Sequence, residues 1–454
     1  MAYKSINPAN FKEIKSYDRL TDEALKEKIN KAHVAYVSWR HTSFHERSVL
    51  MRKLAALLQE KSTHYARIMV EEMGKPIKQA RAEVDKCALV CKYYADNAEK
   101  FLSRQEVESN ASKSMIQYDP LGVIYAVMPW NFPYWQVFRF AAPALMAGNT
   151  ALLKHAENVP QCAGALEEMF TAAGFPEGVF QNLYISHEQS DTVIANKYVQ
   201  GVTLTGSNRA GSHIAAKAGE HIKKHVLELG GSDAFIVLAD ADIEKAIATG
   251  VNARTMNAGQ SCIAAKRFIL HKDIADKFLD GFKRKMEALK IGDPMDESTE
   301  IGPMARKDLM EELEKQVNES VRKGAKVLLG GKPADREGAY YLPSILTDIP
   351  EDSPAYEDEL FGPVAIVFVV ADDDEAIRIA NDHKYGLGGS LWTRDIEKAL
   401  KMSHRLNSGS VFINDMTKSD PRLPFGGIKE SGYGRELSHV GIHEFVNIKT
   451  VYVA

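Results

Sequence analysis

Three segments of this chain carry side chains that could together perform acyl transfer. Cys262 follows the polar loop 257–261, and a thiolate in such a setting attacks carbonyl carbon. Glu228 ends an apolar, strand-like run, where partial burial would raise its pKa toward that of a general base. Asn131, in Pro129-Trp130-Asn131-Phe132-Pro133, offers an amide donor for an oxyanion. The three segments predict an enzyme that forms and then hydrolyses an acyl-cysteine.

The elements that must position these side chains change in character along the chain. Residues 21–103 have the apolar spacing of helices, and strands then alternate with helices, which is typical of a parallel sheet. A strand-like segment at 444–453 needs a partner, for which 115–118 is one candidate. We expect strands at 122–128, 150–154, 179–184, 201–205, 225–229, 234–238 and 268–270, and helices at 134–147, 159–173 and 243–256.

Composition limits the classes of function. The 454 residues are 45% hydrophobic and 26% charged, which is ordinary for a globular chain of two or three domains. With a net charge of −4, the chain lacks the excess of basic residues that is typical of proteins that bind nucleic acid. No secretory signal or membrane-spanning run is apparent. Four cysteines are too few for a disulfide scaffold, and Cys87, Cys91 and Cys162 fit buried apolar positions, so we expect a cytoplasmic protein.

Motifs for phosphate and metal are weak when taken alone. Thr205-Gly206-Ser207 follows a strand and opens a helix, whose free N–H groups could hold a pyrophosphate. Neither the G-x-G-x-x-G fingerprint nor the P-loop pattern occurs. The pairs His41/His45, His221/His225 and His439/His443 lack the glutamate of H-E-x-x-H and a third ligand, so we predict no metal site.

Taken together, the motifs resemble those of the aldehyde dehydrogenase superfamily over essentially the whole chain. Seven motifs in the right order are far more specific than any one of them. They are 129–133, 154–157, 205–207, Glu228-Leu229-Gly230-Gly231, Gly259-Gln260-Ser261-Cys262, Glu359-Leu360-Phe361-Gly362-Pro363 and Pro424-Phe425-Gly426-Gly427.

The resemblance implies a role for each catalytic residue. Cys262 would attack the aldehyde carbon, and the amide of Asn131 with the N–H of Cys262 would hold the oxyanion. Losing one such donor costs about 2.7–4 kcal/mol of barrier. Hydride loss to a nicotinamide would leave a thioester, and Glu228 would activate the water that hydrolyses it.

The resemblance also implies a cofactor site. Lys154 and Glu157 match the pair that contacts the adenosine ribose, and a carboxylate there would repel a 2′-phosphate. We therefore expect NAD rather than NADP, although His155 stands where many relatives have proline. The other expected cofactor-binding residues are Trp130, Gly206, Ser207, Glu359 and Phe361.

The substrate is expected to carry a carboxylate. Arg139 lies among apolar neighbours at a position where succinate-semialdehyde dehydrogenases have an arginine that grips the distal carboxylate. A second arginine of such enzymes is replaced by Met256, and Ser419, six residues before Phe425, could donate a hydrogen bond instead. The chain is most similar to the short bacterial NAD-dependent succinate-semialdehyde dehydrogenases. Alternatives are a broad-range NAD(P)-dependent dehydrogenase for uncharged aliphatic aldehydes and a non-catalytic binding relative.

The expected architecture is α/β, with three parts. The resemblance implies a Rossmann-like NAD-binding domain at 1–105 and 122–229 and a second α/β catalytic domain at 230–428. A small β bridging arm at 106–121 and 429–454 would complete a sheet on a partner subunit. We therefore expect a homodimer or homotetramer that acts on a small-molecule aldehyde.

Overall fold

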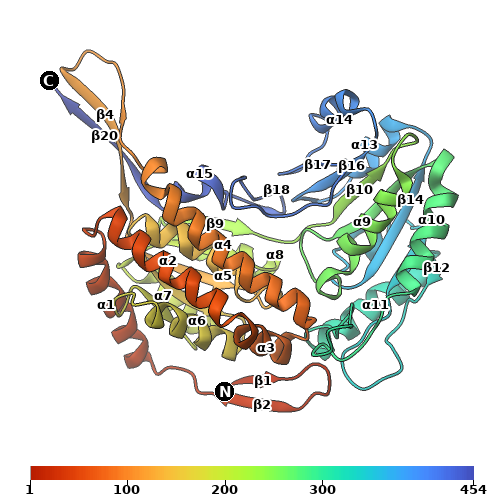
Figure 1. The fold of residues 1–454 in the computed structure, drawn as a ribbon, viewed down its shortest axis with the longest axis horizontal. Coiled ribbons are helices and arrows are strands. Elements are labelled where there is room, and N and C mark those ends of the chain that lie inside the picture. The colour runs from red at the N-terminus through yellow and green to blue at the C-terminus, as the bar shows by residue number, and fades with distance from the viewer. Residues whose placement is uncertain (1) are drawn as a thin grey trace.

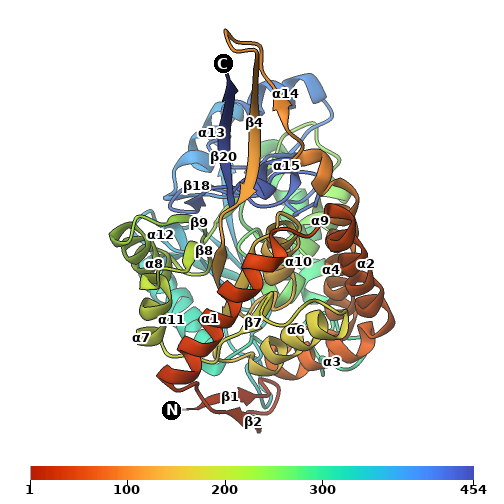
Figure 2. The same ribbon diagram turned by 90° about the vertical axis from the view of Figure 1, so that its left-hand side faces the viewer.

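Two α/β units lie side by side, and a narrow β arm projects from the first of them (Figure 1). The computed structural model describes residues 2–454, and the expected α/β fold class is confirmed. An N-terminal hairpin of β1 (Tyr3–Ile6) and β2 (Glu13–Tyr17) lies at the opposite end of the molecule from the C-terminus (Figure 2). Across residues 2–454, no helix is both long and apolar enough to cross a membrane.

The expected helical start is confirmed, and its boundaries follow from local capping. The Thr21 side chain accepts from the third residue of α1, and Ser43 with Glu46 forms a capping box at the start of α2. Gly74, with φ +75°, ends α3 in a left-handed conformation that favours glycine. The four helices are α1 (Asp22–Trp39), α2 (Phe44–Glu60), α3 (Ser62–Met73) and α4 (Ile77–Phe101).

The first sheet has the strand order β19-β9-β8-β5-β6-β7, with parallel pairing from β9 to β7. Both faces of this sheet are covered by helices, and successive side chains of β5 point to opposite faces. Val123 and Tyr125 pack in one core with α1, α7 and α8, whereas Ile124 and Ala126 pack in the other with α2 to α6. The strands are β5 (Val123–Met128), β6 (Thr150–His155), β7 (Phe180–Asn182), β8 (Val199–Thr205), β9 (Lys224–Glu228) and β19 (Gly432–Tyr433). The helices are α5 (Trp135–Met146), α6 (Pro160–Ala172), α7 (His187–Ala195) and α8 (Asn208–Glu220).

The second sheet has the order β12-β13-β14-β11-β10-β16-β17 and two apolar faces. Phe235 and Phe268 pack against α9 and α10, and Ile236 and Ile269 against α13 and α14. Its strands are β10 (Asp233–Val237), β11 (Ala265–His271), β12 (Lys326–Leu329), β13 (Ser344–Thr347), β14 (Val364–Val370), β16 (Gly389–Trp392) and β17 (Phe412–Ile413). Its helices are α9 (Ile243–Thr255), the 3-10 turn η1 (Met256–Gly259), α10 (Lys272–Glu287), α11 (Lys307–Lys323), α12 (Pro354–Glu357), α13 (Asp373–Asn381) and α14 (Ile396–Ser403).

The arm is a three-stranded sheet of order β20-β4-β3. Its strands are β3 (Gln105–Glu106), β4 (Lys113–Pro120) and β20 (Val446–Val453), so the predicted pairing of the C-terminal strand with 115–118 is confirmed. The division into domains by residue number stays a prediction. Within 429–454, β19 pairs with β9 of the first sheet. The remaining elements are α15 (Ser438–Ile442) and a separate two-stranded sheet of β15 (Tyr385–Gly386) and β18 (Ile428–Lys429).

Candidate active site

Four neighbouring strands of the first sheet end at one edge and bring separate motifs together. Met128 pairs with His155, and Thr205 pairs with Glu228, so β5, β6, β8 and β9 end in register. The segments that leave these ends carry Asn131, Gly206 and other predicted site residues. In parallel α/β sheets this carboxyl edge is where ligands bind, so the topology itself places the predicted site.

The Cys262 loop is held in a specific backbone conformation. Asn257 and Ala258 have φ values of +58° and +52°, and Gly259 has +73°. A Cβ at Gly259 would lie 2.4 Å from the carbonyl carbon of Gly362, so only glycine fits there. The buried Arg254 donates to the Gly259 carbonyl at 2.6 Å and to that of Ala265 at 3.3 Å, which ties the two ends of the loop together.

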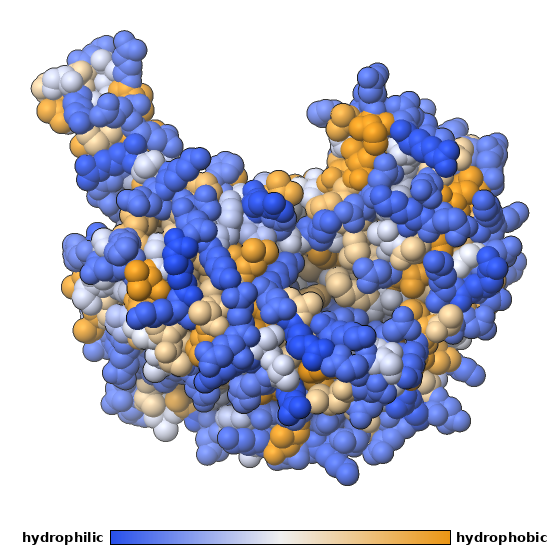
Figure 3. All heavy atoms as spheres, in the orientation of Figure 1, coloured by the Kyte–Doolittle hydropathy of each residue, from blue (hydrophilic) through white to orange (hydrophobic). Residues whose placement is uncertain are grey.

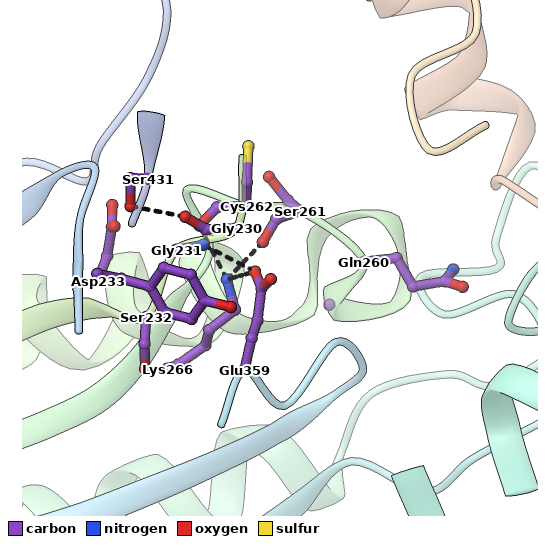
Figure 4. A network of polar contacts seen from close by, with 12 residues as sticks. Gly230, Gly231, Ser232, Asp233, Gln260, Ser261, Cys262, Lys266, Glu359 and Ser431 are labelled. Atoms are coloured by element: carbon purple, nitrogen blue, oxygen red, sulfur yellow. Dashed lines mark hydrogen bonds and ion pairs between the residues drawn. The ribbon is translucent and has the colours of Figure 1, made fainter. Parts of the chain in front are cut away.

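Lys266 joins the nucleophile loop to Glu359. Its ammonium donates to the carbonyls of Ser261 and Cys262 at 2.7 and 2.9 Å and forms a 2.9 Å ion pair with Glu359. Figure 4 shows this cluster on one side of the loop, with the Cys262 sulfur pointing away from it. Burial raises the pKa of the Cys262 thiol to about 12, while Arg139 and Lys266 act in the opposite direction.

Two cavities meet at Cys262, which contributes to the walls of both. One cavity, of about 430 Å³, is bounded by the edge of the first sheet and by α11. The other, of about 330 Å³, lies between α4, α5 and the segment 416–419. A thiol at such a junction can contact a ligand in each cavity, which is what a two-substrate reaction requires.

The larger cavity, here called the cofactor cavity, contains most of the residues predicted to bind a dinucleotide. Its lining includes Trp130, Gly206, Ser207, Glu359 and Phe361. The rings of Trp130 and Phe361 meet edge to face with centroids 5.7 Å apart. The N-terminus of α8 opens there beside Gly206 and Ser207, offering backbone donors to a phosphate. These features fit a dinucleotide.

Glu228 is a buried carboxylate without a hydrogen-bond partner among the residues that the structure describes. It is 2% exposed, and neither of its oxygens accepts a hydrogen bond. Burial raises its pKa well above the usual range, Arg139 lowers it, and Glu436 raises it further. Glu228 lines neither cavity, but its charge acts on the pKa of the Cys262 thiol. An unsatisfied buried carboxylate close to a nucleophile is a candidate general base.

Asn131 lies beside the nucleophile loop, as the sequence predicts. Its amide nitrogen donates to the Gln260 carbonyl at 3.2 Å, and Asn257 donates to the backbone carbonyl of Asn131 at 2.8 Å. Asn131 lines the cofactor cavity together with Cys262. Because an amide NH₂ has two hydrogens, one remains for an oxyanion beside the sulfur.

The smaller cavity, here called the substrate cavity, contains all three residues predicted to bind substrate: Arg139, Ser419 and Phe425. The Arg139 guanidinium forms an ion pair with the buried Glu436 and lies 4.4 Å from the centroid of the Phe425 ring. It also donates to the Thr205 hydroxyl at 3.4 Å. Arg139 is therefore already paired within the protein.

Lys154 and Glu157 lie outside the walls of the cofactor cavity. Lys154 is buried at the end of β6, and Glu157 forms a 3.0 Å ion pair with Arg19. Burial lowers the pKa of Lys154, and the nearby charge of Glu157 opposes that shift. Glu157 also acts on Arg306, whose pKa is raised chiefly by its hydrogen bond with Asp308. The Glu157 carboxylate thus lies near three cations, of which Arg306 is itself paired with Asp308.

Four charged residues near the site escaped the sequence analysis: Arg19, Lys86, Lys266 and Glu436. Arg19 contacts Glu157, Lys86 contacts Ser419 and Glu436 contacts Arg139, in each case across a long stretch of sequence. Lys266 contacts both the distant Glu359 and Cys262, which lies only four residues before it. Lys266 was within reach of sequence reasoning because it adjoins the nucleophile motif. The other three have no local pattern that separates them from surface charges.

Comparison with known proteins matches residues 1–451 to the aldehyde dehydrogenase family. A protein of Synechocystis sp. named probable succinate-semialdehyde dehydrogenase [NADP(+)] is 51% identical over 100% of both chains. Succinate-semialdehyde dehydrogenase [NADP(+)] 1 of Mycobacterium tuberculosis is 48% identical, also over 100% of both. The solved structure of succinic semialdehyde dehydrogenase from Streptococcus pyogenes in complex with NADP⁺ has a TM-score of 0.98 at 40% identity and covers 100% of both chains.

These relatives correct the cofactor expected from the sequence. The preference for NAD inferred from Glu157 is wrong, since both curated relatives are named for NADP(+) and the solved one is in complex with NADP⁺. We attribute this to the ion pair with Arg19. A carboxylate that is neutralised by a guanidinium, with the Lys154 ammonium also nearby, presents little net negative charge to a 2′-phosphate.

Proposed function

Because this chain belongs to the aldehyde dehydrogenase family, we propose that it oxidises succinate semialdehyde to succinate with NADP⁺. The observation that carries the proposal is the position of Cys262 between a cofactor cavity and a second cavity with cationic walls. The names of relatives that are 48–51% identical over their full length support the same substrate and cofactor.

In the first half of the proposed reaction, the Cys262 thiol releases its proton to solvent, and the resulting thiolate adds to the aldehyde carbon. The sulfur–carbon bond forms as the carbonyl oxygen becomes an oxyanion, to which Asn131 and the Cys262 N–H donate. The nicotinamide of bound NADP⁺ supplies the hydride acceptor. Loss of hydride from the former aldehyde carbon leaves a thioester on Cys262.

In the second half, Glu228 takes a proton from water, whose oxygen attacks the thioester carbon. The carbon–sulfur bond breaks, Cys262 leaves as a thiolate, and the acid product forms. The orphaned, buried Glu228 carboxylate supports this role because its raised pKa makes it a stronger base.

The cofactor choice is expected to depend on Arg19. Arg19→Ala leaves Glu157 unpaired, so its charge should repel a 2′-phosphate, and we expect the ratio of kcat/KM for NADP⁺ to that for NAD⁺ to fall about tenfold. Lys4→Ala, which removes an exposed partner of Glu13 on the N-terminal hairpin, is the matched control. An unchanged ratio in Arg19→Ala would show that this ion pair does not govern cofactor choice.

One observation favours the rival substrate class of uncharged aliphatic aldehydes. Arg139, the residue expected to grip a distal carboxylate, is already paired with Glu436, and aromatic and aliphatic side chains share the cavity wall. If Arg139 were the only cation in this cavity, the cavity would therefore offer little net positive charge to the carboxylate of a semialdehyde.

The test is an assay of NADPH formation by the purified full chain. We expect rapid turnover of succinate semialdehyde, slower turnover of butanal, and none with either substrate in Cys262→Ala. Preference for butanal would favour the rival dehydrogenase. Failure to oxidise any aldehyde with either nicotinamide cofactor would favour a binding relative that lacks catalysis.

A further inference from the structure

The substrate cavity has four cations in its wall, and three of them are neutralised within the protein. Lys75 pairs with Glu83, Arg139 with Glu436, and Lys418 with Asp415. The fourth, Lys86 on α4, forms no ion pair with any residue in the part of the chain that the structure describes. Lys86 is thus the cation of this wall whose charge remains available to a ligand.

The Lys86 ammonium is held in place by two uncharged groups. It donates to the Ser419 hydroxyl at 2.7 Å and lies 4.1 Å from the centroid of the Trp135 ring. A hydroxyl that accepts from an ammonium directs its own hydrogen elsewhere, and Ser419 also lines the cavity. Lys86 and Ser419 therefore form a two-donor site on the wall of the cavity that contains Cys262.

The surroundings of Lys86 favour binding of an anion. Burial, followed by the charge of Arg139, lowers the pKa of Lys86 to about 8, while Cys87, Glu83 and Asp420 act in the opposite direction. A partly desolvated ammonium gains more from a carboxylate than an exposed one, because water competes less for it. Arg139 across the cavity raises the positive potential further.

We propose that Lys86, with Ser419, binds the distal carboxylate of the substrate and sets the preference for aldehydes that carry a carboxylate. This inference rests on the proposed function, since it assigns the far end of the semialdehyde whose aldehyde carbon meets Cys262. Arg139, paired with Glu436, then shapes the wall and the field of the cavity rather than providing the principal contact.

The first test is Lys86→Met, which keeps the length and most of the volume of the side chain. We expect KM for succinate semialdehyde to rise about 10- to 150-fold and kcat to change little. This rise corresponds to losing the free energy of a hydrogen bond between charged groups. Butanal, which has no carboxylate, should keep its KM in this variant. Lys86→Arg should recover part of the affinity because it restores the positive charge.

Lys92→Met is the matched control, because Lys92 lies on the same helix as Lys86 but outside the substrate cavity, where its ammonium donates to Gln59. We expect less than a threefold change in KM for either aldehyde. Thermal melting of each variant checks that the fold persists. Equal losses for both aldehydes in Lys86→Met, or a rise in the KM of the semialdehyde below threefold, would overturn the proposed role of Lys86.

A binding experiment separates this inference from the proposed function. Calorimetry with succinate should give binding to wild type and a loss of affinity of about tenfold or more in Lys86→Met. If wild type binds succinate through Lys86 but does not oxidise succinate semialdehyde, the proposed function fails and the carboxylate site stands. If both proteins bind succinate equally, the carboxylate site fails whatever the activity.

The pH dependence supplies a further check. The carboxylate needs protonated Lys86, so the ratio of kcat/KM for succinate semialdehyde to that for butanal should fall as pH rises through about 8. Titration of Cys262 affects both aldehydes and cancels in this ratio. Lys86→Arg, which stays charged, should flatten the profile. A wild-type ratio that does not change between pH 7 and 9, a range of about one unit on either side of this pKa, would contradict the assignment.

Discussion

Cys262 illustrates how single residues are tuned by contacts outside their own motif. Burial raises the pKa of its thiol to about 12, which keeps the sulfur protonated at neutral pH in the ligand-free protein. Arg139 and Lys266 oppose this shift, and Lys266 also donates to the carbonyls of Ser261 and Cys262, one on each side of the Cys262 α-carbon. The nucleophile therefore depends on Lys266 for both charge and position.

Alkylation of Cys262 by iodoacetamide measures this dependence. Because the thiolate fraction far below a pKa rises tenfold with each pH unit, the rate should rise about tenfold between pH 7 and 8. In Lys266→Met the pKa rises further, so alkylation should slow several-fold at each pH. Lys217→Met, an exposed lysine paired with Glu220, is the control. Equal rates in wild type and Lys266→Met would contradict the role of Lys266.

At the scale of elements, α4 anchors the segment that carries Asn131. One oxygen of Glu83 on α4 accepts from the N–H groups of Tyr134 and Trp135 at 3.0 Å each, and the other meets Lys75. The Lys75 ammonium also lies 3.9 Å from the centroid of the Phe132 ring. This buried pair fixes the start of α5 and the turn that precedes it, so an element far from Cys262 in sequence positions the oxyanion donor.

Glu83→Ala should destabilise the protein and reduce kcat. It leaves Lys75 buried without a counter-charge and two amides without an acceptor, for which we expect a loss of about 3–5 kcal/mol in the free energy of unfolding. Glu83→Gln combined with Lys75→Met removes both charges and keeps an acceptor, so it should recover much of the stability. Denaturant unfolding and steady-state kinetics provide the measurements, and a Glu83→Ala protein with wild-type values of both would contradict this account.

At the scale of the whole molecule, the projecting arm presents apolar side chains to solvent. Ile448 and Tyr452 are 61% and 57% exposed on β20, which is an edge strand, and Figure 3 shows apolar residues on this projection. Edge strands with exposed apolar side chains tend to pair with another chain. We propose, in line with the sequence analysis, that the arm binds a second copy and gives a homodimer or homotetramer.

Deletion of residues 447–454 tests this proposal by removing β20 beyond Val446, which is buried in the core of the first unit and is kept. We expect the molar mass from light scattering to fall to that of a monomer, with the α/β units still folded because the arm is a separate sheet. Ile222→Asp, which replaces an apolar residue that is 95% exposed elsewhere on the surface, should leave the mass unchanged. A deletion variant that retains the mass of the intact protein would place the subunit contact elsewhere.

Local patterns in the sequence determined the secondary structure and the family of this protein. The helical start, the five parallel strands of the first sheet and the pairing of β20 with β4 were predicted and are confirmed, whereas β19 of the first sheet was not predicted. Cys262, Glu228 and Asn131 could be named because each lies in a motif of adjacent residues. Periodicity and short motifs act over a few positions, which is the range that a single sequence displays.

Only the tertiary structure decided which charges neutralise one another. Arg19 pairs with Glu157 across 138 positions, and Lys86 bonds Ser419 across 333. We attribute the wrong prediction of NAD to the first contact, and the second contact underlies the carboxylate site that we propose at Lys86. Such contacts depend on how packed helices and sheets bring distant segments together, and the free energy of a charge depends on the neighbours and burial that this packing provides.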